Sequence, residues 1–493
     1  MTVALRPTDD ASPASRSSVA RLLTTASWTI AVLVLTLISL SAVFRTNDLL
    51  GALLAEFPRP YGRAGLAAIA VYAAGSLAVI VFARLCAARQ WLVGPRLPLL
   101  IVALAIIVRV VLAMVADAPL NAENRIVHEQ ALKVLDGACC FSHRPLGYPI
   151  ALAGAYALLG VGPTAIETLN IAFAAVTVAL VWQIGNVTWG RSVAAVAASA
   201  YAVVPSQVLM VIVPLTEPMY TMLVTGAVRV AIVLERRPAL AAGAVSAGLL
   251  AVAQYVRATA APLVVLVAVL PWLVGWTLRR TLLRAALIGC LFMALLLPVI
   301  AYNVRAYGDL SVATSAYGGW SLYVGANREA GGQWNAADAA RLAGFPGDSW
   351  WERSEYAGTL VIGRVMEDPL GSLAVLPRKF ATVWGDETYA ATYALRGQAV
   401  TRDVHVGWLA SQLFWLPLVV LATLGMVVAR RDPHPAALLI GMSVSLVAVM
   451  HLALEVHSRY HAYLVPLVCL LAATGADAVA RSWRGRRPLS AAP

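Results

Sequence analysis

Several acidic and basic side chains lie between long apolar runs, where they could do chemistry. Glu123 and Glu129 belong to the polar stretch "NAENRIVHEQALKVLDG", and Glu217 belongs to "VPLTEPMY". Glu123 and Glu129 are six positions apart. On a helix this is about 600° of rotation, so the two side chains point to different faces and do not form a close pair. Other charged or titratable residues lie at the ends of further apolar runs: Arg109, Arg257, Arg305, Glu455, His457, Arg459 and His461.

Carboxylates near several arginines suit a substrate that carries a phosphate group. A guanidinium is planar and permanently charged, and its N–H groups match the oxygens of a phosphate. A carboxylate beside it can act as a general base toward a hydroxyl group. The alternative is that these charges only mark a membrane interface, where they pair with lipid head groups.

The composition predicts which elements position these residues. Of 493 residues, 60% are hydrophobic and 13% are charged, with a mean hydropathy of +0.77. Soluble domains are about one quarter charged. The apolar runs are about 17–25 residues long, which is enough to cross a bilayer as a helix. Lipid cannot satisfy backbone polar groups, so the sequence predicts an all-α polytopic membrane protein.

Twelve membrane-spanning helices are expected. Their approximate ranges are 27–44, 64–83, 98–117, 165–187, 192–211, 218–234, 239–256, 260–277, 282–302, 407–429, 435–453 and 460–480. Arginines cluster at alternate ends of these segments, for example in the tail "RSWRGRRP". The positive-inside rule then places both termini in the cytoplasm and the chain in the plasma (inner) membrane. The net charge of +12 follows this topology, so no nucleic-acid partner is expected.

Four regions follow from this topology. Residues 1–97 form a cytoplasmic N-terminus and two accessory spans, and 98–302 form a transmembrane catalytic core with an outer loop at 117–163. Residues 303–406 form an extracytoplasmic loop or small domain after span nine, and long loops of this kind are commonly functional. Residues 407–493 form the last three spans and a basic cytoplasmic tail. Within the outer loop, "YPIALAGAYALLGVG" is too short to span and predicts an interfacial helix.

The five cysteines show no metal-ligand spacing. Cys139 and Cys140 are adjacent in the outer loop, where packing is the simpler interpretation and a redox role is the alternative.

Six segments of the chain, taken in order, resemble one family. They are "ENRIVHEQALKVLDG", "HRPLGYPIALAGAYALLG", "VPLTEPMY", "SAYGGWSLYVGANREAGGQW", "DPLGSLAVLPRKFATVWG" and "HSRYHAYLVPLVCLLAATGA". Between about residues 98 and 480 the chain resembles the C-type membrane glycosyltransferases that use polyprenyl-phosphate sugars. This superfamily includes protein O-mannosyltransferases and lipid A aminoarabinose transferases.

The resemblance implies a role for the acid of the first loop. Glu123 falls where the family has its catalytic Asp, whose carboxylate activates the acceptor. The family often has a second acid next to that Asp, whereas this chain has Asn124, and a common aromatic residue four positions on is Val127 here. Glu129 is the alternate base.

The resemblance also implies how the donor is held. The candidates for binding the substrate and its phosphate are Arg144, Glu217, Arg257, Arg305, Lys379 and Arg459. In some metal-dependent relatives a second outer carboxylate completes a divalent-ion site, which here would join Glu217 to Glu123 around Mg²⁺ or Mn²⁺. Other relatives need no metal, so no cofactor is required by this sequence.

The implied activity is transfer of a sugar from a polyprenyl-phosphate donor to a hydroxyl group of a glycan, lipid or protein at the outer face, with inversion. One alternative is a twelve-span secondary transporter, although transporter sites usually lie at the membrane midplane. Another is a non-catalytic relative that binds lipid-linked glycans. The sequence leaves the sugar and the acceptor open.

Overall fold

The computed structural model describes residues 18–56, 60–92, 94–116, 118, 120–138, 144–234, 240–273, 275–395, 402–431 and 433–485. Cys139 and Cys140, the N-terminal arginines Arg6 and Arg16, and residues 486–493 of the tail lie outside these residues. Throughout the described chain the regular secondary structure is helical, as the sequence predicted.

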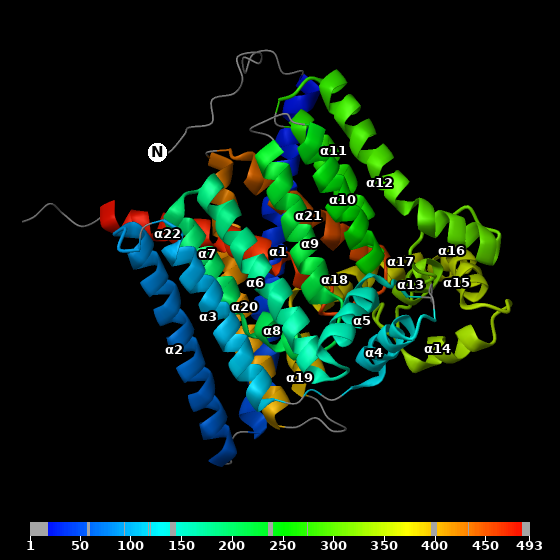
Figure 1. Cartoon of the computed structure of the whole chain (residues 1–493), viewed down its shortest axis with the longest axis horizontal. Helices are drawn as coiled ribbons and strands as arrows, with labels where there is room; N and C mark the ends of the chain where they lie inside the picture. Colours follow the sequence, from blue (N-terminus) through cyan, green and yellow to red (C-terminus); the bar gives the residue numbers. More distant parts are fainter. Residues whose placement is uncertain are drawn as a thin grey trace, which may run out of the picture.

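The long helices form an elongated bundle (Figure 1). They are α1 (Ser18–Glu56), α2 (Pro60–Ala88), α3 (Arg96–Val115), α6 (Pro163–Thr188), α7 (Arg191–Val203), α9 (Glu217–Leu234), α10 (Leu240–Val256), α11 (Ala261–Leu273), α12 (Leu278–Tyr307), α20 (Arg402–Arg431), α21 (Pro435–Ala453) and α22 (Val465–Gly485). Each of the twelve expected apolar segments coincides with one of these helices, and the segment at 192–211 also includes α8 (Pro205–Leu209) and the short 3₁₀ helix η2 (Met210–Ile212).

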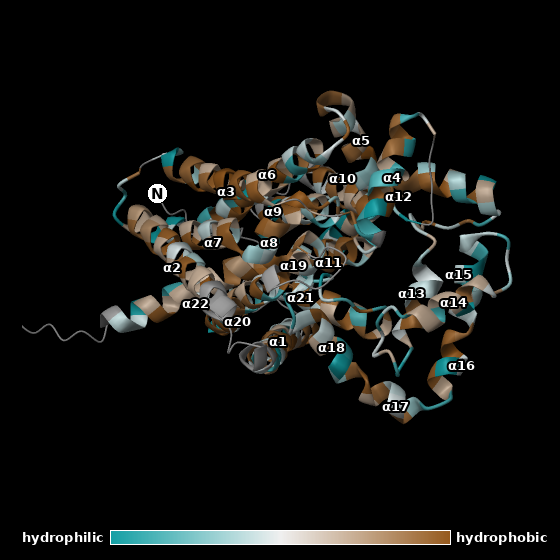
Figure 2. Cartoon of the chain, turned by 90° about the horizontal axis from the view of Figure 1, so that it is seen from below, coloured by the Kyte–Doolittle hydropathy of each residue, from teal (hydrophilic) through white to brown (hydrophobic). Residues whose placement is uncertain are grey.

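Eight of the described helices are long and apolar enough to cross a membrane, and a ninth crossing results if the bent pair α7 and α8 with η2 is one span. The most apolar window of α22 is 78% buried inside the molecule, whereas that of α3 is only 17% buried. So much apolar surface on α3 would be unfavourable in water, and Figure 2 shows this helix as strongly hydrophobic. The bundle is therefore a membrane protein, with α22 at its centre and α3 at its lipid-facing periphery.

A break divides the fifth apolar segment. Val204 is extended and precedes Pro205, and the two helical parts meet at 55°. Proline disfavours a helical conformation for the residue before it and cannot donate a backbone hydrogen bond. The guanidinium of Arg109 in α3 donates to the carbonyl of Ala202 at 2.9 Å, just before the break. Arg109 is fully buried, so it stabilises the break and does not lie at an exposed edge.

The remaining helices gather at one end of the bundle, which we call the loop-rich face (Figure 1). They are α4 (Ala122–Leu135), α5 (Gly147–Leu159), α13 (Gly318–Gly325), α14 (Ala336–Ala343), α15 (Trp350–Thr359), α16 (Val361–Met366), α17 (Pro369–Ala374), α18 (Leu376–Trp384) and α19 (Tyr389–Leu395). The sequence placed both of these regions, 117–163 and 303–406, on the same side. The helix α5 has only 13 residues and packs against α4, α6 and α10.

Beneath this face a second group of polar residues is enclosed in the bundle, and we call it the interior polar cluster: Ser206, Glu387, Gln412 and His461. Glu387 accepts a hydrogen bond from the Ser206 hydroxyl and pairs with Nε2 of His461. The imidazole lies between the rings of Trp384 and Trp415, with centroid separations of 5.3 and 4.7 Å. Glu387 and His461 are both fully buried.

Candidate active site

Five charged side chains meet at the loop-rich face, and we call them the arginine–carboxylate cluster: Glu123, Arg144, Glu217, Arg257 and Arg459. They come from α4, from the segment before α5, from the start of α9, from the residue after α10 and from the loop between α21 and α22. All five were candidates from the sequence.

Glu123 is held from both sides. Asn121 caps α4 by accepting a hydrogen bond from the backbone of Asn124, which fixes the first turn where Glu123 lies. Its Oε1 accepts from Arg459 Nη2 at 2.5 Å and from Arg144 Nη1 at 3.2 Å. Its Oε2 accepts from the Tyr393 hydroxyl at 2.8 Å.

Glu217 lies next to Glu123 and shares one of its partners. Its Oε1 accepts from Arg257 Nη1 at 2.5 Å, and Arg459 Nε lies 3.7 Å from the same oxygen. Arg459 therefore bridges the two carboxylates. Glu217 is 3% exposed, whereas the side chain of Glu123 is 25% exposed, so Glu123 is the more accessible of these two carboxylates.

Aromatic rings surround the guanidinium groups. Tyr460 lies under both Arg257 and Arg459, at 5.2 and 5.7 Å from the ring centroid. Tyr393 contacts Arg459 at 5.3 Å, and Tyr317 contacts Arg144 at 5.4 Å. Ring faces at these distances attract cations, so the arginines are positioned without losing their positive charge.

A glycine sets the distance between two sides of the cluster. A Cβ atom on Gly147, the first residue of α5, would lie 2.8 Å from the backbone of Tyr255. This close approach holds the segment of Arg144 against the end of α10, where Arg257 follows. Further along α5, the Tyr148 hydroxyl donates to Asn170 of α6 at 2.9 Å and ties the helix to the bundle.

The charges in the cluster determine the protonation of Glu123. Burial alone would raise the pKa of Glu123, but Arg459, Arg144 and the hydrogen bonds from Arg459 and Tyr393 outweigh it and hold the pKa well below its usual range. Glu123 is therefore ionised at any physiological pH.

The two carboxylates do not fit a divalent cation in this arrangement. Guanidinium groups already occupy Oε1 of Glu123 and Oε1 of Glu217. Mg²⁺ and Mn²⁺ prefer several oxygen ligands. Within the described residues, no group of three or more His, Cys, Asp or Glu side chains is placed to hold a metal ion.

Three further candidates from the sequence lie elsewhere. Glu129 is exposed on α4, and Arg305 is exposed near the end of α12 without an ion pair to the cluster. Lys379 is buried, and its ammonium donates to the carbonyls of Gly325 at 2.8 Å and Leu452 at 2.7 Å. Tyr317 and Tyr393 contact the cluster but were not predicted, because a tyrosine in an aromatic-rich loop gives no signal of its own.

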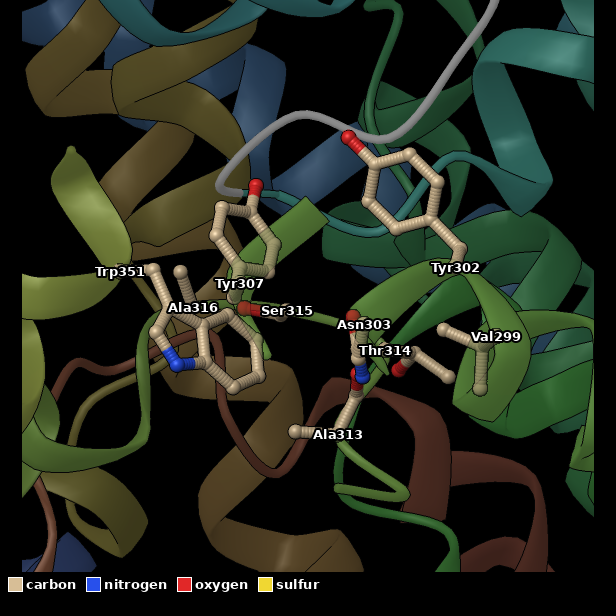
Figure 3. A pocket seen from close by; sticks show the side chains of 9 residues that line it. All are labelled: Val299, Tyr302, Asn303, Tyr307, Ala313, Thr314, Ser315, Ala316 and Trp351. Atoms are coloured by element: carbon tan, nitrogen blue, oxygen red, sulfur yellow. The ribbon is translucent and has the colours of Figure 1, made fainter. Parts of the chain in front are cut away.

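A small hollow lies between the end of α12, the segment that follows it and α15 (Figure 3). Its volume is about 10 Å³, the space that one water molecule needs. It is lined by Val299, Tyr302, Asn303, Tyr307, Ala313, Thr314, Ser315, Ala316 and Trp351. The rings of Tyr307 and Trp351 stack at 4.8 Å along one wall. It contains no member of the arginine–carboxylate cluster and is too small for a sugar.

No family model matches the chain, and no curated protein does either. Similar solved structures include the oligosaccharyltransferase of Archaeoglobus fulgidus in its apo form, which is 10% identical with a TM-score of 0.49 over 80% of this chain and 51% of that one. This chain thus spans about half the length of that oligosaccharyltransferase.

ArnT from Cupriavidus metallidurans, solved with bound undecaprenyl phosphate, is 14% identical with a TM-score of 0.39 over 80% of this chain and 79% of that one. Its apo state is 15% identical with a TM-score of 0.37 over 82% of each chain. These enzymes are C-type glycosyltransferases, the superfamily that the sequence resembles. All three TM-scores lie below 0.5, so the function proposed next depends on the geometry of the cluster itself.

Proposed function

We propose that this chain is a membrane glycosyltransferase that moves a hexosyl or pentosyl group from a polyprenyl-phosphate donor to a hydroxyl group. The acceptor would be a glycan, lipid or protein of the cell envelope. The reaction would take place at the loop-rich face, which the positive-inside rule places outside the plasma membrane.

The observation that carries this proposal is the charge balance of the cluster. Three guanidinium groups, those of Arg144, Arg257 and Arg459, face the two carboxylates of Glu123 and Glu217. Among these five side chains the positive charges outnumber the negative ones by one, so the site can attract the negatively charged phosphodiester of a donor. The phosphate that leaves carries more negative charge than the donor, so the same guanidinium groups stabilise the departing group more strongly than the bound donor.

The position of the cluster supports a donor that arrives from the lipid. A polyprenyl chain stays in the bilayer, so its phosphate can reach a site only at the membrane boundary. The cluster is formed by residues at the ends of α9 and α10 and by loops that adjoin α5 and α22. It is not in the middle of the spans, where transporter sites usually lie.

In the proposed step, the acceptor hydroxyl loses its proton and its oxygen attacks the anomeric carbon. The bond from that carbon to the phosphate oxygen breaks, and polyprenyl phosphate leaves with the bonding electrons. A single displacement of this kind inverts the anomeric configuration. Glu123, with its 25% exposed side chain, is placed to contact the acceptor and to orient Arg144 and Arg459.

The experiment uses the purified chain in liposomes with a panel of short-chain polyprenyl-phosphate hexoses and pentoses and an extract of envelope glycans. We expect one donor to release polyprenyl phosphate, as measured by liquid chromatography. Arg305→Ala is the control, because this exposed arginine has no ion pair to the cluster, and it should release the product at the wild-type rate.

Two results would contradict the proposal. No release with any donor, together with uptake of a labelled solute by the same vesicles, would indicate a transporter. Binding of donor without release would indicate a non-catalytic relative. If a donor reacts, mass spectrometry of envelope glycans with and without the protein would identify the acceptor.

A further inference from the structure

A third glutamate faces the arginine–carboxylate cluster from the loop between α21 and α22. Glu455 is 8% exposed. Its side chain accepts no hydrogen bond from any residue that the structure describes, and its oxygens are not among the fully enclosed polar atoms. A buried carboxylate that lacks a partner yet remains reachable is costly, and such groups tend to be functional.

The backbone of this loop is fixed against the neighbouring helix. The Glu455 backbone N–H donates to the Ser321 carbonyl of α13 at 2.8 Å. A Cβ atom on Gly325 would lie 2.3 Å from the carbonyl oxygen of Ala453, so α13 and the loop touch backbone to backbone. Lys379 bridges the same two segments through the carbonyls of Gly325 and Leu452. These three contacts fix the backbone of residues 452–455.

This position brings Glu455 to the side of the cluster where Arg144 lies. Tyr317 lies one helical turn before Ser321, and its ring contacts Arg144, which pairs with Glu123. The titratable and charged groups around the Glu455 carboxyl are Glu123, Arg144, Tyr317, Arg459 and Tyr460, and His457 follows two residues later in the same loop.

We propose that Glu455, and not Glu123, takes the proton from the acceptor hydroxyl. The inference rests on the proposed glycosyl transfer and names the base for it. The O–H bond of the acceptor breaks and its proton goes to a Glu455 oxygen, while the acceptor oxygen forms its bond to the anomeric carbon. The electron pair of the broken carbon–oxygen bond leaves with polyprenyl phosphate, and Glu455 later releases its proton to water.

The electrostatic surroundings of the two glutamates support this division. Burial raises the pKa of Glu455 to about 7, although Arg459 acts in the opposite direction. A base is most effective when its pKa lies near the working pH. The ion pairs of Glu123 hold its pKa far lower, so its carboxylate is a weak proton acceptor. Glu123 instead stays negatively charged and keeps Arg144 and Arg459 in position.

The test compares Glu455→Gln with Glu123→Gln in the release assay between pH 5 and 9, pH values that bracket the expected transition. In the wild type, kcat should rise with pH and level off above about 7, because Glu455 must be ionised. Glu455→Gln should lower kcat by about 10²-fold or more and remove this rise. Glu123→Gln should lower kcat but keep its rise with pH. Glu455→Asp, which retains a carboxylate, should recover part of the kcat that Glu455→Gln loses. A rise that disappears only in Glu123→Gln would overturn the inference.

A second measurement does not depend on transfer. Infrared difference spectra of the wild type should show a carboxylic acid band that appears as the pH falls through about 7, and this band should be missing in Glu455→Gln. If the wild type releases no polyprenyl phosphate, the proposed function fails. If release is normal but the band is absent, or Glu455→Gln keeps its rate, only the inference about Glu455 fails.

Discussion

The arginine–carboxylate cluster and the interior polar cluster each contain glutamates among aromatic rings, but they balance the charge in different ways. Each carboxylate oxygen of Glu387 has its own partner: Oε1 accepts from the Ser206 hydroxyl and Oε2 pairs with Nε2 of His461. All three side chains are fully buried. Glu123 and Glu217 share Arg459, and the side chains of that cluster are exposed by 3–25%. Buried polar groups of this kind, each with its own fixed partner, stabilise the fold. A shared, partly exposed set with surplus charge can exchange a partner for a substrate.

The largest effect should come from the arginine that both carboxylates share. Arg459→Ala leaves Glu123 and Glu217 without their common cation and removes one guanidinium from the phosphate. We expect a loss of about 10³-fold in kcat/KM, or roughly 4 kcal/mol in the transition state. The release assay measures this, with Arg305→Ala as the matched arginine control. Equal losses in the two variants would show that total charge matters and that the cluster geometry does not.

A substitution in the interior polar cluster should lower the stability of the fold and leave the rate of transfer nearly unchanged. Glu387→Gln removes the charge from a site where Ser206 and His461 are fully buried and do not contact bulk solvent. We expect the free energy of unfolding to fall by about 1–3 kcal/mol, measured by thermal unfolding in detergent. Activity per folded molecule should stay within about twofold of the wild type. A large activity loss in correctly folded protein would erase the distinction between the two clusters.

Lys379 should have the smallest effect on activity, and its signature is the dependence of stability on pH. Burial lowers the pKa of Lys379 to about 8 from its usual 10.5, so above pH 8 the unfolded chain binds more protons than the folded one. Stability should therefore rise with pH between about 8 and 10.5 because of this group. Lys379→Met, which keeps the length of the side chain, should remove that part of the rise. Chemical unfolding curves at several pH values measure it, and parallel curves for the two proteins would contradict the assignment.

The fold was predictable because a membrane span has one dominant requirement, a long apolar run. All twelve expected segments coincide with helices, although the number that cross the membrane stays a prediction. The break at Val204 was missed. Pro205 was visible in the sequence, but proline also occurs inside α11, α12 and α20 without ending them. Whether a proline breaks a span depends on a partner such as Arg109, which lies 93 positions from Ala202.

The sequence selected the five charged residues that lie together in the arginine–carboxylate cluster, but it did not predict how they pair. The expected topology placed Glu123, Glu217, Arg257 and Arg459 on one face, and the structure brings them together. The same argument also selected Arg305 and could not distinguish it from the arginines of the cluster. Topology predicts on which face of the membrane a residue lies, but not the direction in which its side chain points. The pair of Arg459 and Glu123 joins residues 336 positions apart, a distance at which local sequence carries no information on contact.

The break between α7 and α8 also constrains the order in which this chain can be assembled. Backbone groups that lack hydrogen bonds cost several kcal/mol each in lipid. Arg109, which bonds to Ala202 at the break, belongs to α3 and is synthesised before α7. The second half of the break is secured later, when Gln207 donates to Ala462 and Ser206 to Glu387. Arg459 arrives with that same late segment. A ribosome must therefore complete nearly the whole chain before Glu123 gains the partner that links it to Glu217.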